Sequence, residues 1–138
     1  MSTFTSSALA SMLDGFETFM LVGSGTANFT VYQTNTALCV FPLAASPFGA
    51  ANANSLTLAS TPISSTGTEV AGTANRFVIT NQNGDTAASG TISAVGGGGD
   101  IQTPALTVTA AATQALNALV LRIASSGLLS WEGSLTLV

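Results

Sequence analysis

The chain has 138 residues, only eight of them charged, with a formal net charge of −4 and no Lys or His. Two arginines are too few for nucleic-acid binding, which needs several basic side chains against the phosphates. The absence of His and Lys also removes the groups on which most catalytic sites depend, so we expect no enzyme and no cofactor.

The surface of such a chain must be neutral. Soluble domains carry roughly a quarter charged residues, and here Thr, Ser, Asn, Gln, Gly and Ala must take their place. Such a surface lacks the charge repulsion that keeps copies apart, which predicts burial against other protein. The length predicts one domain, residues 1–138. No apolar run approaches the ~20 residues of a membrane span, and no basic segment precedes one, so we expect no membrane and a cytoplasmic origin.

The first element predicted is an α-helix or arm over about residues 6–21. Its apolar residues recur at three- and four-residue steps, which is typical of one helical stripe. Ser6 or Ser7 is the expected N-cap, and Gly23–Gly25 ends the helix. It packs either on its own domain or on a neighbouring subunit as an N-terminal arm. The stripe comprises Leu9, Met12, Leu13, Phe16, Phe19 and Met20.

From about residue 28 to 138 the pattern becomes β-like. Runs at 29–32 and 37–43 predict two strands, the second ended by Pro42. A loop over 44–54 carries one large apolar side chain, Phe48. The run at 56–59 then alternates with period two, which predicts another short strand.

The middle of the chain predicts a hairpin. Residues 74–80 and 87–95 form its strands, and Asn83-Gly84 supplies the positive φ that a tight turn needs. The glycines at 96–99 predict a loop closed by Asp100.

The last third contains an ambiguous segment. Residues 106–110 predict a strand by alternation. Over 110–124 a helix competes with a strand, and we favour the strand because Leu119, Leu121 and Ile123 alternate on one face. Residues 128–138 predict the final strand. Short strands separated by Gly-rich turns indicate a mainly β fold, a single-domain β-sandwich or jelly-roll-like fold with a short N-terminal α-helix.

The sequence gives little support for a metal site or for catalysis by a pair of carboxylates. The soft metal ligands are missing apart from Cys39, which reads as a small buried hydrophobe. Asp85 and Asp100 lack the spacing of a calcium loop, so we expect no metal. Asp14 and Glu17 lie three residues apart, and we expect them to solvate the outer face of the helix.

Four residues are candidates for an interface. Arg76 and Arg122 are the only cations, each on a predicted strand, where an internal salt bridge competes with an inter-subunit pair. Trp131 could belong either to the core or to an interface, and the sequence leaves both open. Phe48 is the large apolar side chain of its loop.

Residues 74–92 resemble a pattern found in small virion proteins of tailed bacteriophages, and the order of motifs around them does too. The pattern has an N-terminal helix, an extended segment like residues 29–33 and a loop like Pro47-Phe48-Gly49-Ala50-Ala51. An Asn-Gly turn, a Gly-Thr-Ile return strand at 90–92 and a Gly-rich stretch ending in Asp100 follow. The chain ends with a strand like residues 135–138. Residues 110–130 depart from the pattern because they are longer.

The resemblance implies a non-enzymatic capsid decoration or cement protein that stabilises the shell by bridging capsomers. Its partners would be the major capsid protein and copies of itself, as a homo-oligomer such as a trimer. It would be made in the host cytoplasm and reside on the capsid surface of the virion. One alternative is a tail, neck or fibre-associated virion protein. A second is a carbohydrate- or ligand-binding β module that uses Trp131, Tyr32 and the loop acids.

Overall fold

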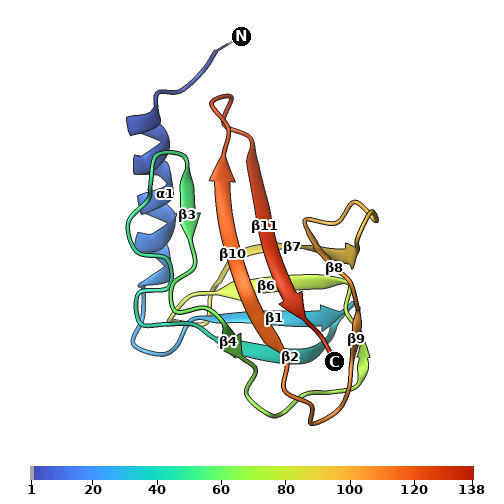
Figure 1. Cartoon of the computed structure of the whole chain (residues 1–138). Coiled ribbons are helices and arrows are strands. Elements are labelled where there is room, and N and C mark those ends of the chain that lie inside the picture. Colours follow the sequence, from blue (N-terminus) through green and yellow to red (C-terminus); the bar gives the residue numbers. More distant parts are fainter. Residues whose placement is uncertain (1) are drawn as a thin grey trace.

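The computed structural model describes residues 2–138, and over that range it is mainly β, with one helix and eleven strands (Figure 1). Helix α1 spans Ser6–Met20. None of the described helical structure is long and apolar enough to cross a membrane. The strands are β1 Asn28–Gln33, β2 Thr36–Pro42, β3 Ser55–Thr57, β4 Ile63–Ser64, β5 Gly72–Thr73, β6 Arg76–Thr80, β7 Thr86–Ala94, β8 Ile101–Thr103, β9 Thr107–Val108, β10 Ala115–Ile123 and β11 Leu129–Thr136.

The strands form two sheets that pack as a β-sandwich. The larger sheet has the order β2-β1-β6-β7-β8, in which β7 and β8 run parallel and the other neighbours are antiparallel. The smaller sheet has the order β11-β10-β3, and β4 pairs with the start of β10. A separate ribbon joins β5 to β9. The β10–β11 hairpin crosses the larger sheet, and its tip projects beyond it beside α1 (Figure 1).

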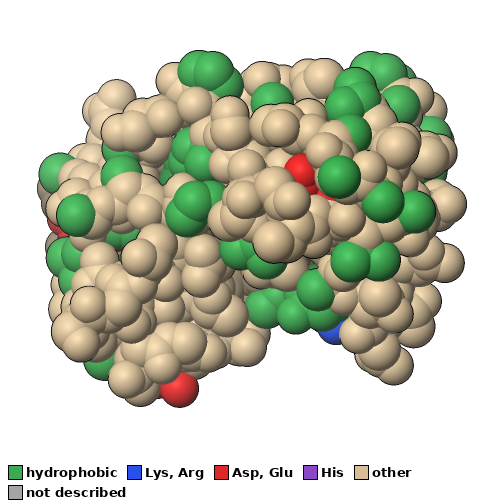
Figure 2. All heavy atoms as spheres, turned by 90° about the horizontal axis from the view of Figure 1, so that it is seen from below, with side chains coloured by type: hydrophobic (Ala, Val, Ile, Leu, Met, Phe, Trp, Pro, Cys, Tyr) green, Lys and Arg blue, Asp and Glu red, His purple; other side chains and the backbone are tan. Residues whose placement is uncertain are grey.

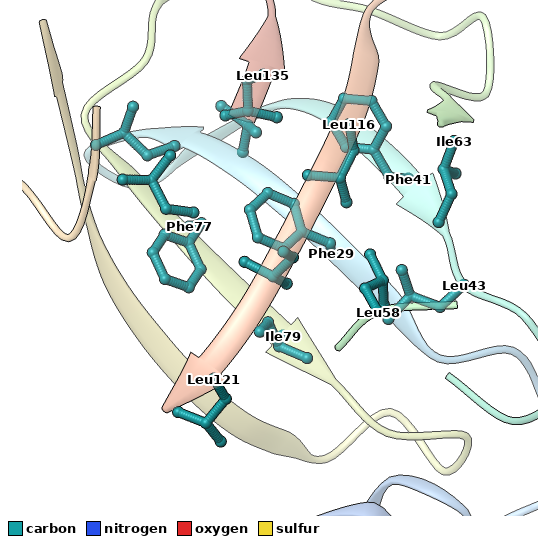
Figure 3. Close-up of a cluster of buried hydrophobic side chains, with 14 of the residues drawn as sticks. Phe29, Phe41, Leu43, Leu58, Ile63, Phe77, Ile79, Leu116, Leu121 and Leu135 are labelled. Carbon is teal, nitrogen blue, oxygen red and sulfur yellow. The ribbon is translucent and has the colours of Figure 1, made fainter. Parts of the chain in front are cut away.

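Inward and outward side chains alternate along β1 and β6, which places the core between the two layers. Phe29 and Phe77 are fully buried on the inner face of the larger sheet, and Leu119 and Leu121 face them from β10. Figure 3 labels Phe29 and Phe77 on the larger sheet and Leu121 on β10, and the Phe29 ring lies beside the β10 ribbon. Each such side chain contributes about 1.5–3 kcal/mol through burial, so a core of this size holds the domain together without a disulfide.

A line of aromatic contacts runs through this core. The Phe29 ring stacks on Phe77 with centroids 5.1 Å apart, and Phe77 meets the ring of Trp131 edge-to-face at 6.0 Å. Trp131 in turn contacts Phe16 of α1 at 6.1 Å and Phe48 of the 44–54 loop at 6.4 Å. One side chain of β11 therefore joins the larger sheet, the helix and the loop.

Helix α1 packs on its own domain, with Leu9, Leu13 and Met20 buried, so the expected range of 6–21 is confirmed to within one residue. The cap differs from expectation. Thr5, not Ser6 or Ser7, is the N-cap, and its hydroxyl oxygen accepts from the Ala8 N–H at 3.3 Å.

The acids of α1 were expected to solvate its outer face, and for Glu17 this is wrong. Glu17 is only 7% exposed, and its Oε2 accepts hydrogen bonds from the N–H groups of Phe48 at 3.0 Å and Gly49 at 2.6 Å. Asp14 Oδ1 accepts from the Ala51 N–H at 2.8 Å. The two carboxylates, one helical turn apart, therefore anchor the 44–54 loop by its backbone.

The ambiguous segment of the last third is a strand, as favoured. β10 spans Ala115–Ile123, and its inner residues are buried by the larger sheet. A bulge lies between Leu116 and Ala118. The strand expected at 106–110 is reduced to β9, Thr107–Val108, because the chain turns away where Ala111 adopts a positive φ of 60°.

Replacing Glu17 by Gln should lower the free energy of unfolding by about 1–3 kcal/mol, because the buried N–H groups of Phe48 and Gly49 then face a neutral amide, whose oxygen accepts more weakly and whose NH2 group cannot accept. Urea unfolding at neutral pH measures the change. The matched control is Glu132→Gln, an exposed acid, which should change stability by at most about 1 kcal/mol. Equal effects of the two substitutions would contradict the anchoring role of Glu17.

Candidate interaction surface

The acids of the chain are used mainly within it. Besides Asp14 and Glu17, Asp100 Oδ2 accepts from the N–H and hydroxyl of Thr91 at 2.8 and 3.0 Å. Asp85 Oδ2 accepts from the side-chain amide of Asn83 at 3.0 Å. These groups fix turns and loops, but Asp14, Asp85 and Asp100 stay exposed, so the surface keeps a sparse negative charge.

Arg122 forms an ion pair on the outer face of the smaller sheet. Its Nε lies 3.2 Å from Glu132 Oε1, and both side chains are largely exposed. β10 and β11 pair in register Arg122 with Ser130 and Val120 with Glu132, so the ion pair is a diagonal cross-strand contact. Such exposed ion pairs contribute about 0–1 kcal/mol to the free energy of unfolding. The two opposite charges leave this part of the hairpin locally neutral.

Arg76 lies at the start of β6 on the other side of the molecule. Its guanidinium carbon is 4.3 Å from the centroid of the Tyr32 ring, and its Nε donates to the backbone carbonyl of Thr34. The two arginines are therefore not brought together, and each has an intramolecular partner. Their role in an interface remains a prediction.

Phe48 and Trp131, by contrast, are brought together in the aromatic cluster. Phe48 is buried and Trp131 is half-buried. Any contribution of Phe48 to an interface must come through the backbone of its loop. Arg76 lies over the Tyr32 ring, and Trp131 packs on three aromatic rings, so both candidate platform residues have aromatic or cationic neighbours within the chain.

The surface instead presents scattered apolar side chains. Figure 2 shows one face on which neutral atoms predominate, with isolated acidic and basic side chains among green apolar ones. The large apolar residues exposed over the molecule are Phe4, Met12, Phe19, Leu21, Val22, Val70, Val95, Leu128, Leu129 and Val138. Exposed apolar groups of this kind mark protein contact surfaces when they gather. Phe4 and the pair Leu128 and Leu129 gather at the β10–β11 tip, where the Phe4 N–H donates to Ser125 C=O and its ring lies over Gly127.

A small hollow lies near the end of β11 in the described chain. A recess of about 110 Å³ lies between the segment after β8 and the end of β11, lined by Pro104, Ala105 and Leu137 among others. Ligand pockets usually measure about 300–1,000 Å³. Residues 2–138 contain no group of three or more side chains placed to hold a metal ion.

Glu69 is the exception among the acids, and sequence reasoning gave no signal for it. It is 5% exposed, and neither carboxylate oxygen has a hydrogen-bond partner in the described chain. The Glu69 carboxylate lies close enough to Cys39 of β2 to influence its thiol electrostatically. Burial first, and the Glu69 carboxylate second, raise the pKa of the Cys39 thiol from 9.0 to about 12.

No family model, curated protein or solved structure matches this chain. The assignment of a function therefore depends on the residues and surfaces described above.

Replacing Glu69 by Gln should raise the free energy of unfolding by about 1 kcal/mol or more, because it removes a buried charge that lacks donors. The same substitution at Glu17 lowers stability, so the two variants provide a pair of opposite sign. Urea unfolding of both against the parent chain measures the difference. A loss of stability in Glu69→Gln would contradict a buried carboxylate without hydrogen-bond donors.

The raised pKa of Cys39 predicts a pH dependence of stability. Above pH 9.0 the unfolded chain releases the thiol proton, whereas the folded chain keeps it up to about pH 12. The free energy of unfolding is therefore unaffected by this group below pH 9.0 and decreases as the pH rises toward about 12. The slope from this one group is about 1.4 kcal/mol per pH unit. The difference between the parent and Cys39→Ala isolates it, since other groups titrate equally in both. Parallel stability curves above pH 9 would contradict the prediction.

Proposed function

We propose that this protein is a non-enzymatic structural protein of a tailed-phage virion, a decoration protein that cements the capsid. The proposal depends mainly on the observation that most charged side chains have partners within the chain. Carboxylates at five positions and both arginines interact within the chain, and the rest of the exposed surface consists mainly of neutral polar and apolar groups. The resemblance of residues 74–92 and of the motifs around them to small virion proteins supports the same class.

The mechanism we infer is adhesion through buried neutral surface. Each copy lies across a seam between capsomers and covers apolar area there, which contributes roughly 25 cal/mol per Å² removed from water. Because few charges take part, attachment gains little from electrostatic steering. A copy that contacts two capsomers resists their separation, and many weak copies together stabilise the shell.

A position on the tail, neck or a fibre is the main alternative within the same class. The neutral surface suits both positions, and the number of copies distinguishes them. A shell protein occurs in a number comparable to that of the major capsid protein. A neck or tail protein occurs as one or a few rings.

The proposal predicts that purified particles carry the protein at a fixed, high ratio to the major capsid protein, measured by quantitative mass spectrometry. It also predicts that the protein stays bound between about 0.05 and 1 M salt, although the screening length falls to about 3 Å at the upper limit. Particles made without the protein should lose their shells at lower temperature. A ring-like copy number would indicate the tail or neck position. Release by salt alone would contradict a neutral interface.

A further inference from the structure

The outer strand of the smaller sheet has one free edge. β11, Leu129–Thr136, pairs along one side with β10. Its other side meets β8 over the second half of the strand, where the Ile101 side chain lies against Gly133 and the Thr103 hydroxyl donates to the Leu135 carbonyl at 3.2 Å. The half nearer the hairpin tip projects beyond the larger sheet (Figure 1).

Hydrogen bonds of β10 reveal which β11 groups point outward. The Leu119 carbonyl accepts from the Leu58 N–H at 2.8 Å, and the Ile123 N–H donates to the Asn54 carbonyl at 3.0 Å, so both residues direct these groups away from β11. Residues opposite one another in an antiparallel pair either both bond to each other or both point away. Their partners, Gly133 and Leu129, therefore direct N–H and C=O groups outward.

Trp131 lies midway between these two residues and has the same orientation, because backbone groups alternate with period two. The outward carbonyl of Leu135, two residues beyond Gly133, agrees with this assignment. Within residues 2–138, the outward N–H and C=O groups of Leu129, Trp131 and Gly133 have no hydrogen-bond partner.

Other edges of the fold are protected. The outer side of β2 is covered because its Leu38 and Val40 carbonyls accept from Val70 and Thr66, and β2 ends at Pro42. β8 has three residues and is followed by Pro104, while β3 also has three. Natural edges are usually blunted by Lys, Pro, bulges or short length.

The tip half of β11 has none of these devices. Its sequence, Leu129-Ser130-Trp131-Glu132-Gly133, contains no Lys or Pro, and the bulge of this hairpin lies in β10. Glu132 is the one charge, and Arg122 neutralises it. This edge is therefore open to another strand without electrostatic cost.

We propose that the tip half of β11 pairs antiparallel with the same segment of a second copy, about a two-fold axis at Trp131. Three outward residues spaced by two are self-complementary in this arrangement. Trp131 exchanges both backbone hydrogen bonds with the other copy's Trp131, and Leu129 does so with Gly133. The two smaller sheets then become one continuous sheet, the isologous contact that a two-fold dimer requires.

Side chains at the tip support a second copy as the occupant. Leu128 and Leu129 are 73% and 58% exposed, so they extend past the core of their own copy. The Arg122–Glu132 pair gives each edge zero local charge, so two identical edges do not repel each other. The inference does not depend on a place in a virion.

The test measures the mass of the purified protein by analytical ultracentrifugation over a concentration series. We expect a monomer–dimer equilibrium for the parent chain and a monomer for Leu129→Lys, because a lysine ammonium is placed at the pairing edge. Val95→Lys is the matched control. It also replaces an exposed apolar residue, 70% exposed in the turn after β7, and should dimerise like the parent.

Hydrogen exchange of the parent chain gives a second readout that requires no variant. The amides of Leu129, Trp131 and Gly133 should exchange more slowly as concentration rises, together with the dimer fraction. Thermal melting confirms that Leu129→Lys is folded. A parent chain that stays monomeric, with these amides exchanging freely, overturns the proposal. So does a dimer that persists in Leu129→Lys, or an edge occupied only by a segment of a different protein.

Discussion

The ring contacts of Trp131 are the interaction on which the arrangement of the sheets, the helix and the 44–54 loop depends. Trp131 belongs to β11, yet its ring touches Phe77 of the larger sheet, Phe16 of α1 and Phe48 of the loop. Sheet, helix and loop come from distant parts of the chain, and this side chain is the point at which they meet. Aromatic pairs of this geometry contribute about 0.5–1.5 kcal/mol each beyond their burial, so the junction supports the relative placement of all three.

The scarce charges serve the same purpose. Glu17 and Asp14 hold the loop that carries Phe48 against the helix that carries Phe16. The carboxylates thereby position two of the rings around Trp131. The few charges of this chain serve mainly its own loops and turns, and most exposed side chains are neutral. That division connects the interior of the fold with the kind of surface it presents.

Sequence patterns predict the regular elements well because those elements follow local rules. Period-two alternation identified β10 despite its Ala and Leu content, and Asn83-Gly84 located the β6–β7 turn. The contacts of Glu17 and Glu69 were not predictable, since they depend on which loop the fold brings opposite each carboxylate. Burial of Phe48 follows from the same loop anchoring. Among the candidate interface residues, the sequence could not indicate that Arg122 and Glu132 would face each other diagonally.

The register of the β10–β11 hairpin also determines where the chain tolerates a change in length. One residue added within Leu129–Leu135 reverses the faces beyond it, which turns apolar side chains to water and brings polar ones inside. β10 already accommodates an extra residue in its bulge near Leu116. The turn at 125–127 accepts insertions without this reversal, because each strand keeps its own alternation. Variation in length among natural variants of this hairpin should therefore concentrate at its turn.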